Sequence, residues 1–323
     1  STSGFAKLVY ERYREENFRV GGVGDESWGQ QLNRDNWNLA LGNTHAFGSG
    51  NQLNEFRFQI GQRDYDEPTN SDDVEEWFSL GNTLKIGTNT VGDLVGAGDY
   101  WEVRNTYHWS AAGDRGTHDV KLGFSLFHVK EFSDIPVFQG GLLLWPLDTR
   151  LVPALAYGYT KGSAAVTAET DIISGFVQDN WRLRDNLTVT LGLRYDIDTN
   201  GNNPNFRNPL TGEREVDNDN IQPRFGFSWD MTRDGNNVLR GGLGLFNGRY
   251  LLVPTLQELQ QNGTTGLQVL TNANGLYYGL PPAFWLTPAD PENSGLPLPP
   301  DIILLQDSLK APESWQASLG FTQ

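Results

Sequence analysis

The sequence predicts an all-β protein, an antiparallel transmembrane β-barrel with about ten strands present. Three observations indicate this fold class. Apolar and polar residues alternate strictly in many stretches, and period two over eight or more residues is the signal of a strand. The connections between these stretches alternate between short and long, as in outer-membrane barrels. Aromatic residues gather near both ends of the stretches, where a barrel has its two aromatic belts.

The predicted strands share one two-sided pattern. In "LTVTLGLRYD", Val189, Leu191 and Leu193 lie on one face, and Thr190 and Arg194 lie on the other. In chain order, the strands lie near residues 1–13, 37–44, 54–61, 101–109, 120–126, 173–183, 187–196, 222–230, 239–246 and 315–321. Their apolar sides include Trp37, Leu39 and Leu41; Phe56, Phe58 and Ile60; Val103 and Tyr107; Val120, Leu122, Phe124 and Leu126; Phe225 and Phe227; Leu239, Leu243 and Leu245; and Ala317, Leu319 and Phe321. Helical spacing is weak and confined to 252–261.

The connections indicate a membrane barrel more strongly than the strands do. The short ones are residues 48–51, 113–116, 184–186 and 234–236, and the long ones are roughly 13–35, 66–98, 133–168, 199–218 and 250–312. Outer-membrane barrels have short periplasmic turns and long extracellular loops, whereas loops of this length are rare inside compact soluble domains. The segment 79–88 also has a strand pattern, but a barrel strand there would put a short turn on the wrong side, so we assign it to a long loop.

The hairpin around residue 235 has a predicted register. If both apolar faces point the same way, Phe227 pairs with Leu243 across a three-residue loop. Asp230 then lies opposite Arg240 on the polar face, where an ion pair contributes about 0.2–1 kcal/mol. A slip by one residue would move the charges into the apolar layer, so the register is well specified.

The two faces predict different surroundings. The apolar face is expected to contact lipid, with aromatic belts formed by Phe47, Trp109, Trp181 and Trp229 at the short-turn end and Trp37, Trp101, Tyr195 and Trp315 at the long-loop end. The polar residues predicted to face the lumen are Arg57, Glu102, Arg104, Arg194, Arg224, Asp230 and Arg240. A dry core does not tolerate so many charges. Asp179 is the exception, because it falls on the apolar face unless a bulge turns it inward.

Composition excludes several classes of protein. The net charge of −16 argues against a nucleic-acid partner, because phosphate binding needs a basic surface. Cysteine is absent, which excludes disulfides and cysteine metal sites and is compatible with a bacterial envelope protein. No apolar run of about 18 residues predicts a membrane-spanning helix. Both ends of the chain have a strand pattern and the residues from Ser1 onward do not have the pattern of a signal peptide, so we expect a mature chain or, in preference, a piece of a longer one.

The stretch "GFVQDNWRLRDNLTVTLGLRYD" (175–196) resembles a frequent hairpin of TonB-dependent outer-membrane receptors. Further stretches resemble the Oar-like branch of that family: "NEFRFQIG", "GTHDVKLGFSLF", "QPRFGFSWD" and "LRGGLGLFNGRY". The resemblance implies a barrel of about twenty-two strands, an N-terminal plug domain and a short box that TonB binds. Residues 1–323 are therefore expected to be one barrel segment. The plug, the box and the C-terminal strands are not present in it.

No motif predicts an enzyme, a cofactor or a metal centre. The segment "DIDTNG" places Asp196, Asp198 and Asn200 as in the start of a calcium loop, but the twelfth position is Arg207 instead of glutamate. The four histidines lack metal-ligand spacing. Seven carboxylates between residues 64 and 76 form either a solvated loop or a surface that attracts cations and divalent-bridged lipopolysaccharide.

The outer loops are where a ligand is expected, but their residues follow no readable code. Phe284 and Trp285, in the proline-rich segment 281–300, are candidates for contact with a ligand or partner, although a loop packed on itself is an equal interpretation. Otherwise the ligand-binding residues are unknown.

Three functional hypotheses follow. The first is the barrel of a TonB-dependent receptor that binds or imports a solute through its long loops. Its partners would be outer-membrane lipid and lipopolysaccharide, an extracellular protein or solute, and the TonB complex through the missing N-terminal part. The second is a structural or adhesion barrel that presents its loops to partners without transport. The third is a soluble β-rich binding protein, for example one that binds carbohydrate, whose aromatic residues fill a core or form a platform for a sugar.

Overall fold

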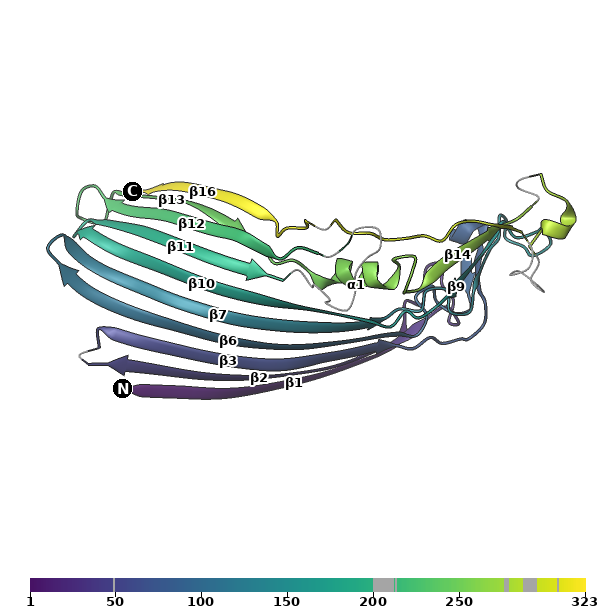
Figure 1. The fold of residues 1–323 in the computed structure, drawn as a ribbon, viewed down its shortest axis with the longest axis horizontal. Helices are drawn as coiled ribbons and strands as arrows, with labels where there is room; N and C mark the ends of the chain where they lie inside the picture. Colours follow the sequence, from purple (N-terminus) through teal and green to yellow (C-terminus); the bar gives the residue numbers. More distant parts are fainter. Residues whose placement is uncertain (49, 200–211, 213, 276–278, 287–294, 307) are drawn as a thin grey trace.

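The computed structural model describes residues 1–323 except 49, 200–211, 213, 276–278, 287–294 and 307. Its main feature is a curved antiparallel sheet of ten strands, each paired with its neighbours along the chain (Figure 1). In order these strands are β1 (Thr2–Phe18), β2 (Gln30–Phe47), β3 (Gln52–Glu67), β6 (Leu94–Gly113), β7 (Gly116–Asp134), β10 (Val166–Arg184), β11 (Leu187–Asp198), β12 (Asp217–Asp230), β13 (Val238–Asn247) and β16 (Glu313–Thr322).

The ten predicted strands and the alternation of short and long connections are confirmed. The short turns gather at one end of the sheet, and the long connections gather at the other (Figure 1). The strands are longer than predicted. For example, β6 has 20 residues and β7 has 19, whereas the predicted strands covered only 101–109 and 120–126. They therefore extend beyond the length of about 9–11 residues that spans a bilayer, toward the long connections.

The two faces of the sheet differ in what covers them. The helix α1 (Leu252–Gln260) packs on one face, where its Leu256 and Leu259 form a buried cluster with Ala168 of β10. On the other face, Leu191 and Leu243 remain 47% and 49% exposed, and no second layer of the described chain packs on them. We call these the concave and the outer face. The tryptophans of the ten-stranded sheet therefore do not fill a sandwich core, contrary to the soluble interpretation.

The register predicted for the β12–β13 hairpin is wrong by two residues. Phe227 pairs with Gly241, and Arg240 pairs with Ser228 instead of lying opposite Asp230. A shift by two keeps every side chain on its predicted face, because side chains alternate with a period of two. Only the cross-strand partners change, so the expected ion pair of Asp230 with Arg240 is not formed.

The larger turn of this hairpin explains the shift. The two carboxylate oxygens of Asp230 accept hydrogen bonds from the backbone N–H groups of Arg233 and Gly235, at 2.9 and 2.8 Å. Arg233 and Gly235 both have positive φ. The backbone N–H of Met231 donates to the carbonyl of Asn237, which closes a seven-residue connection instead of three residues. Asp230 thus stabilises the turn rather than a cross-strand ion pair.

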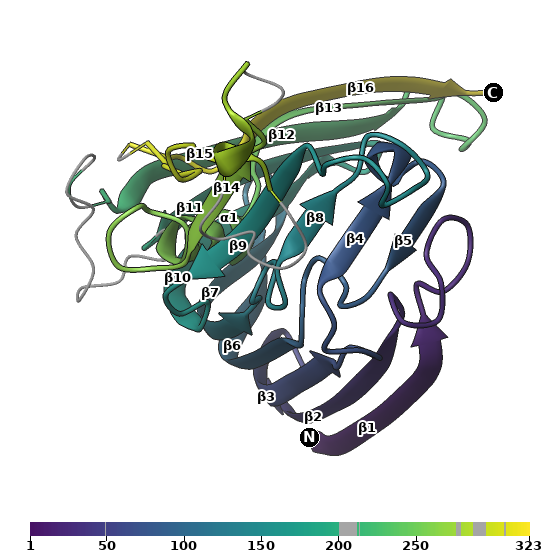
Figure 2. The ribbon, with the colours of Figure 1, turned by 90° about the vertical axis from the view of Figure 1, so that its right-hand side faces the viewer.

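The long connections build a second sheet that the sequence did not predict. Figure 2 shows it standing at the end of the ten-stranded sheet. Its order is β15 (Leu296–Pro297), β14 (Gln268–Ala273), β9 (Ala156–Lys161), β8 (Leu142–Leu144), β4 (Glu75–Phe78) and β5 (Leu84–Ile86). Phe78, Trp145, Tyr157 and Leu286 form its buried core. Residues 79–88 lie outside the ten-stranded sheet, as predicted.

In the described chain, the outer edges of β1 and β16 have no neighbouring strand. Both ends of the chain lie at the short-turn end of the sheet (Figure 1). A spanning sheet must pair every backbone N–H and C=O group, because hydrocarbon offers no alternative partner. In a membrane the backbone groups of these two edges must therefore be paired as well.

Asp179 lies on the outer face, and no bulge turns it inward. It is flanked there by Val120 of β7 and Leu191 of β11 in a regular cross-strand row. Its carboxylate accepts a hydrogen bond from Nδ1 of His118 at 2.7 Å, and the His118 ring stacks on Trp181 with 5.2 Å between centroids. The carboxylate of Asp179 on the apolar face is thus paired with His118, next to Trp181 at the short-turn end.

Removing the partner of this carboxylate should destabilise the barrel. We expect His118→Ala to lower the free energy of unfolding by about 1–2 kcal/mol, because Asp179 loses its donor on the lipid side. Urea unfolding in lipid vesicles measures the change. His128→Ala is the matched control, since His128 holds Asp171 in the same way but the Asp171 side chain is 57% exposed, against 24% for Asp179. Equal losses in both variants would contradict the assignment.

Candidate functional site

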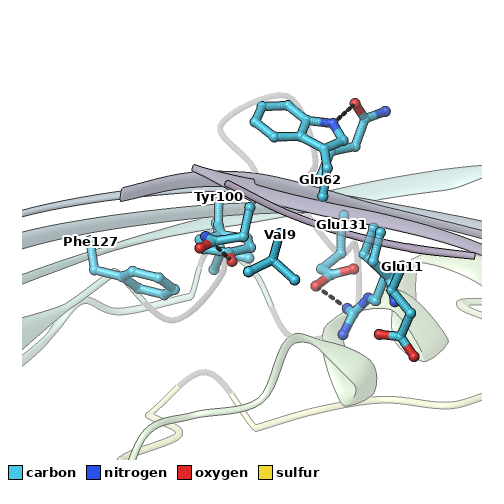
Figure 3. Close-up of a pocket in the computed structure, with 12 residues that line it drawn as sticks. Val9, Glu11, Gln62, Tyr100, Phe127 and Glu131 are labelled. Atoms are coloured by element: carbon cyan, nitrogen blue, oxygen red, sulfur yellow. Dashed lines mark hydrogen bonds and ion pairs between the residues drawn. The ribbon is translucent and has the colours of Figure 1, made fainter. Parts of the chain in front are cut away.

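The concave face carries a cavity of about 470 Å³ near the long-loop end of the sheet. A volume of this size is typical of sites for small molecules. Figure 3 shows Val9, Glu11, Tyr100, Phe127 and Glu131 on one side of the sheet, and Gln62 on the opposite side. The remaining lining residues are Asn36, Trp37, Asn38, Arg63, Gly98 and Val129.

Two neighbouring rows of cross-strand partners form the floor of this cavity. The first row is Val9, Asn38, Gly61, Tyr100 and Val129, taken from β1, β2, β3, β6 and β7. The second row crosses the same strands as Glu11, Asn36, Arg63, Gly98 and Glu131. Residues two apart on a strand share a face, so regular register places both rows side by side on the concave face.

One glycine in each row makes room for a larger neighbour. A Cβ on Gly61 would lie 2.7 Å from the hydroxyl of Tyr100, and a Cβ on Gly98 would lie 2.6 Å from a carboxylate oxygen of Glu131. The Tyr100 side chain and the Glu131 carboxylate therefore lie against bare backbone. Side chains at either glycine would push these two groups out of their present positions.

Polar contacts hold part of the lining in place. Arg63 donates from Nη2 to Oε1 of Glu131 at 2.7 Å, and Asn38 donates from Nδ2 to the hydroxyl of Tyr100 at 2.8 Å. The rings of Tyr100 and Phe127 lie 6.4 Å apart at a tilt of 41°. The cavity thus combines an aromatic surface with fixed amide and charged groups.

The two rows were not among the site residues predicted from the sequence. Arg63 and Glu131 lie beyond the C-terminal ends of the predicted strands 54–61 and 120–126. Asn36 lies one residue before the start of the predicted strand 37–44. Their rows become visible only when the strands are extended and their register is known. The signal that would have found them is the continued alternation of "RFQIGQRDYD", in which Arg63 keeps the phase of Arg57.

The residues predicted to face the lumen form two separate groups on the concave face. In the first, Glu102 accepts from Arg104 at 2.6 Å, while Arg57 pairs with Arg104 across the strands. In the second, Arg194 donates to Asp196 at 3.0 Å, and the guanidinium of Arg224 lies 4.6 Å from the centre of the Phe246 ring. Whether this face lines an aqueous lumen stays a prediction.

Asp230 and Arg240 do not join either group. Asp230 holds its turn, and Arg240 lies beside Ser228 near the short-turn end. The predicted site is therefore not one constellation but two clusters and two separate residues.

The candidate calcium ligands have other partners. Asp196 accepts from Arg194 and from Gln222, the latter at 2.7 Å, and Asp198 accepts from Thr170 at 2.8 Å. Asn200 lies outside the described residues. Within the described part of the chain, no group of three or more histidine, aspartate or glutamate residues could hold a metal ion.

The candidate contact residues of the proline-rich loop pack partly on their own segment. Phe284 ends a short 3₁₀ helix (Pro282–Phe284) and is 47% exposed. Trp285 donates from its indole nitrogen to the carbonyl of Leu280 at 2.9 Å. The contacts support a loop packed on itself, and a ligand contact by these two residues stays a prediction.

The acidic connection after β3 is more ordered than a solvated charge run. Glu67 accepts from Arg19 at 2.9 Å. Glu76 accepts from both Nε and Nη2 of Arg150, at 2.8 and 2.6 Å. The carboxylates of Glu67 and Glu76 thus link this part of the chain to two other long connections, the one after β1 and the one between β8 and β9.

Glu75 is the most buried of these carboxyl groups. One of its oxygens accepts from the indole nitrogens of Trp28 and Trp77, at 2.6 and 2.7 Å, and from the hydroxyl of Thr90 at 2.7 Å. The other oxygen is buried and has no hydrogen-bond partner among the described residues. Burial raises the pKa of Glu75 above its ordinary value, and the three donors oppose this effect only in part.

Comparisons with known proteins agree with this architecture. A family model described as outer membrane beta barrel domain matches residues 1–323. The outer membrane transporter YddB from Escherichia coli is 14% identical, with a TM-score of 0.53 over 84% of this chain and 35% of that one. The ferric preacinetobactin receptor BauA from Acinetobacter baumannii is 11% identical, with a TM-score of 0.49 over 99% of this chain and 42% of that one.

The likeness to YddB shows a shared fold, and this chain spans about a third of its length. No curated protein matches the chain. None of the helices in the described residues is long and apolar enough to cross a bilayer.

The raised pKa of Glu75 predicts a pH-dependent second sheet. A carboxyl whose pKa is higher in the folded than in the unfolded state stabilises the fold at low pH, and this contribution is lost as pH rises through the folded pKa. Between about pH 4 and about pH 8, we expect hydrogen-exchange protection of β4 to fall in the natural protein. Glu75→Gln should remove this fall, because it keeps the acceptor oxygen without the charge.

Asp72→Asn is the matched control, since Asp72 is exposed in the same connection. It should leave the pH dependence of β4 protection intact. A Glu75→Gln variant that keeps the full pH dependence would show that another group is responsible.

Proposed function

The chain belongs to the outer membrane β-barrel domain family and lies in the bacterial outer membrane, and on that premise we propose that it forms part of the wall of a TonB-dependent, Oar-like receptor that binds and imports a solute. The solute would enter from the side of the long connections and pass along the concave face. No covalent chemistry is involved.

The observation that carries this proposal is a solute-sized cavity on the concave face beside α1. Val129 lines this cavity and also packs against the helix cluster of Leu252 and Leu256. The connection between β13 and β16 therefore reaches back over the same face instead of extending away from the sheet. A receptor needs such an arrangement, because its loops must select a solute next to the path that the solute takes.

The two open edges support a larger barrel. We propose that further strands of the same protein pair with β1 and β16, and that a plug domain and a TonB-binding box belong to the N-terminal part. The supporting observations are the unpaired edges and the share of YddB that this chain spans. The full gene is expected to encode a plug and a coupling box before Ser1. A gene without them would favour a structural barrel.

One observation favours a second role, the display of loops to partners. The connection between β8 and β9 exposes apolar side chains, with Leu151 94% exposed and Leu147 53% exposed. Exposed apolar residues at the outermost part of a protein are typical of contact surfaces. Display and import are compatible in one receptor.

The absence of cysteine permits a clean test of orientation. We expect Leu151→Cys to react with a membrane-impermeant maleimide on intact cells, because this connection should lie outside the cell. Asp114→Cys, in the exposed turn between β6 and β7, should react only after the outer membrane is permeabilised. Labelling of Asp114→Cys on intact cells would contradict the proposed orientation.

Import is tested by comparing cells with and without the gene. Cells that carry the gene should deplete at least one solute from a defined medium faster than deletion cells, as measured by mass spectrometry of the medium. An uncoupler of the proton-motive force should abolish the difference, because TonB-dependent import requires that energy. Equal depletion by both strains in every medium that supports expression would favour the display role.

A further inference from the structure

The chemistry of the cavity limits the charge of the solute. Resting on the proposed function, we propose that the cavity formed by the two rows on β1 to β7 binds a positively charged nitrogen group of the solute, an amine or a guanidinium, next to an apolar part of the same solute.

Several hydrogen-bond acceptors of the cavity are not fully matched by donors of the chain. The Glu11 carboxylate is exposed, and no hydrogen bond or ion pair joins it to the described residues. Glu131 receives Arg63 on Oε1, which leaves Oε2 as a further acceptor. Oδ1 of Asn36 also lacks a donor among the described residues, but this atom is buried. An incoming group with N–H donors can therefore bind Glu11 and Glu131.

Two donors of the cavity are held by contacts within the chain. Arg63 donates from Nη2 to Glu131. The amide of Asn38 donates to the hydroxyl of Tyr100 and to the carbonyl of Ile60, at 2.8 and 3.3 Å. A carboxylate or phosphate of a solute would meet the negative charges of Glu11 and Glu131. The cavity therefore disfavours anionic groups.

The charges of the lining residues agree with this pattern. Glu11 and Glu131 contribute two negative charges, and Arg63 contributes one positive charge. The net charge of the lining is thus one negative. A cation that reaches the cavity gains an attractive interaction, and this interaction is stronger on a concave wall than on an open surface, because low-dielectric walls focus the field.

An aromatic surface lies beside the acceptors. The guanidinium of Arg249 lies 4.6 Å from the centre of the Phe127 ring, so one face of this ring is already covered by a cation of the chain. Tyr100, Val9 and Val129 provide the adjoining apolar surface. A solute with a cationic group and an apolar group within a few bonds of each other matches both halves of the cavity.

Dansyl-labelled dipeptides test the proposal on the full-length receptor in detergent micelles. All three are C-terminal amides, so that dansyl-Phe-Arg carries the proposed cation, dansyl-Phe-Gln is neutral and dansyl-Phe-Glu is anionic. Fluorescence anisotropy should give the order Arg, then Gln, then Glu in affinity. Equal affinity for the three peptides, or no binding of dansyl-Phe-Arg at millimolar concentration, would overturn the proposal.

Variants locate the binding to this cavity. Glu11→Gln should weaken dansyl-Phe-Arg roughly three- to fivefold, since the group is exposed. Glu131→Gln should weaken it roughly tenfold or more, because the change also frees the positive charge of Arg63. Glu169→Gln, which removes a charge from the exposed part of β10, is the matched control and should leave the affinity unchanged. Unchanged affinity in both cavity variants would place the binding elsewhere and overturn the proposal.

A gain-of-function variant guards against misfolding. Asn36→Asp adds a carboxylate where the unmatched acceptor lies, and it should increase the affinity for dansyl-Phe-Arg but not for dansyl-Phe-Gln. Heat-modifiable gel mobility shows that each variant is folded. Failure of the two proposals is distinguishable: charge-selective binding without energy-dependent import overturns only the transport function, whereas import without charge selection overturns only the assignment of the cavity.

Discussion

The structure depends on one constraint, that a backbone placed in hydrocarbon must pair all of its hydrogen-bonding groups within the protein. The meander of ten strands satisfies this constraint everywhere except at its two edges, β1 and β16. The same constraint explains the division of side chains, because a regular ladder assigns alternate residues to opposite faces. Leu191 and Leu243 remain uncovered on the outer face, while α1 and the charged clusters share the concave face.

Much of this fold is readable from the sequence because its period is short and local. Val189, Leu191 and Leu193 identify their strand without knowledge of any other segment. The β12–β13 register was less readable, because Asp230 closes a larger turn through backbone N–H groups, and no side-chain pattern reports such contacts. The second sheet was not readable, since β8 has three residues and its partner β4 lies more than sixty positions away in the chain.

The candidate site was predicted only in its general character. A polar, charged concave face followed from Arg57, Arg104 and Arg194, but the cavity residues Arg63 and Glu131 lay past the predicted strand ends. A site made from two residues on each of five strands has no motif, because the strands that contribute them are separated by turns and long connections. The pairing of Asp179 with His118 is similar: the spacing between them gives no sign of contact, yet the register makes them neighbours.

The second sheet joins strands from three different long connections, and β4 and β8 pair within it in parallel. Surface segments of envelope proteins are usually free to diverge, because each one is an independent insertion between two strands. Here a length change in one connection would disturb hydrogen bonds supplied by the other two. Sequence variation in these connections should therefore concentrate at exposed residues such as Leu151 and spare the paired segments.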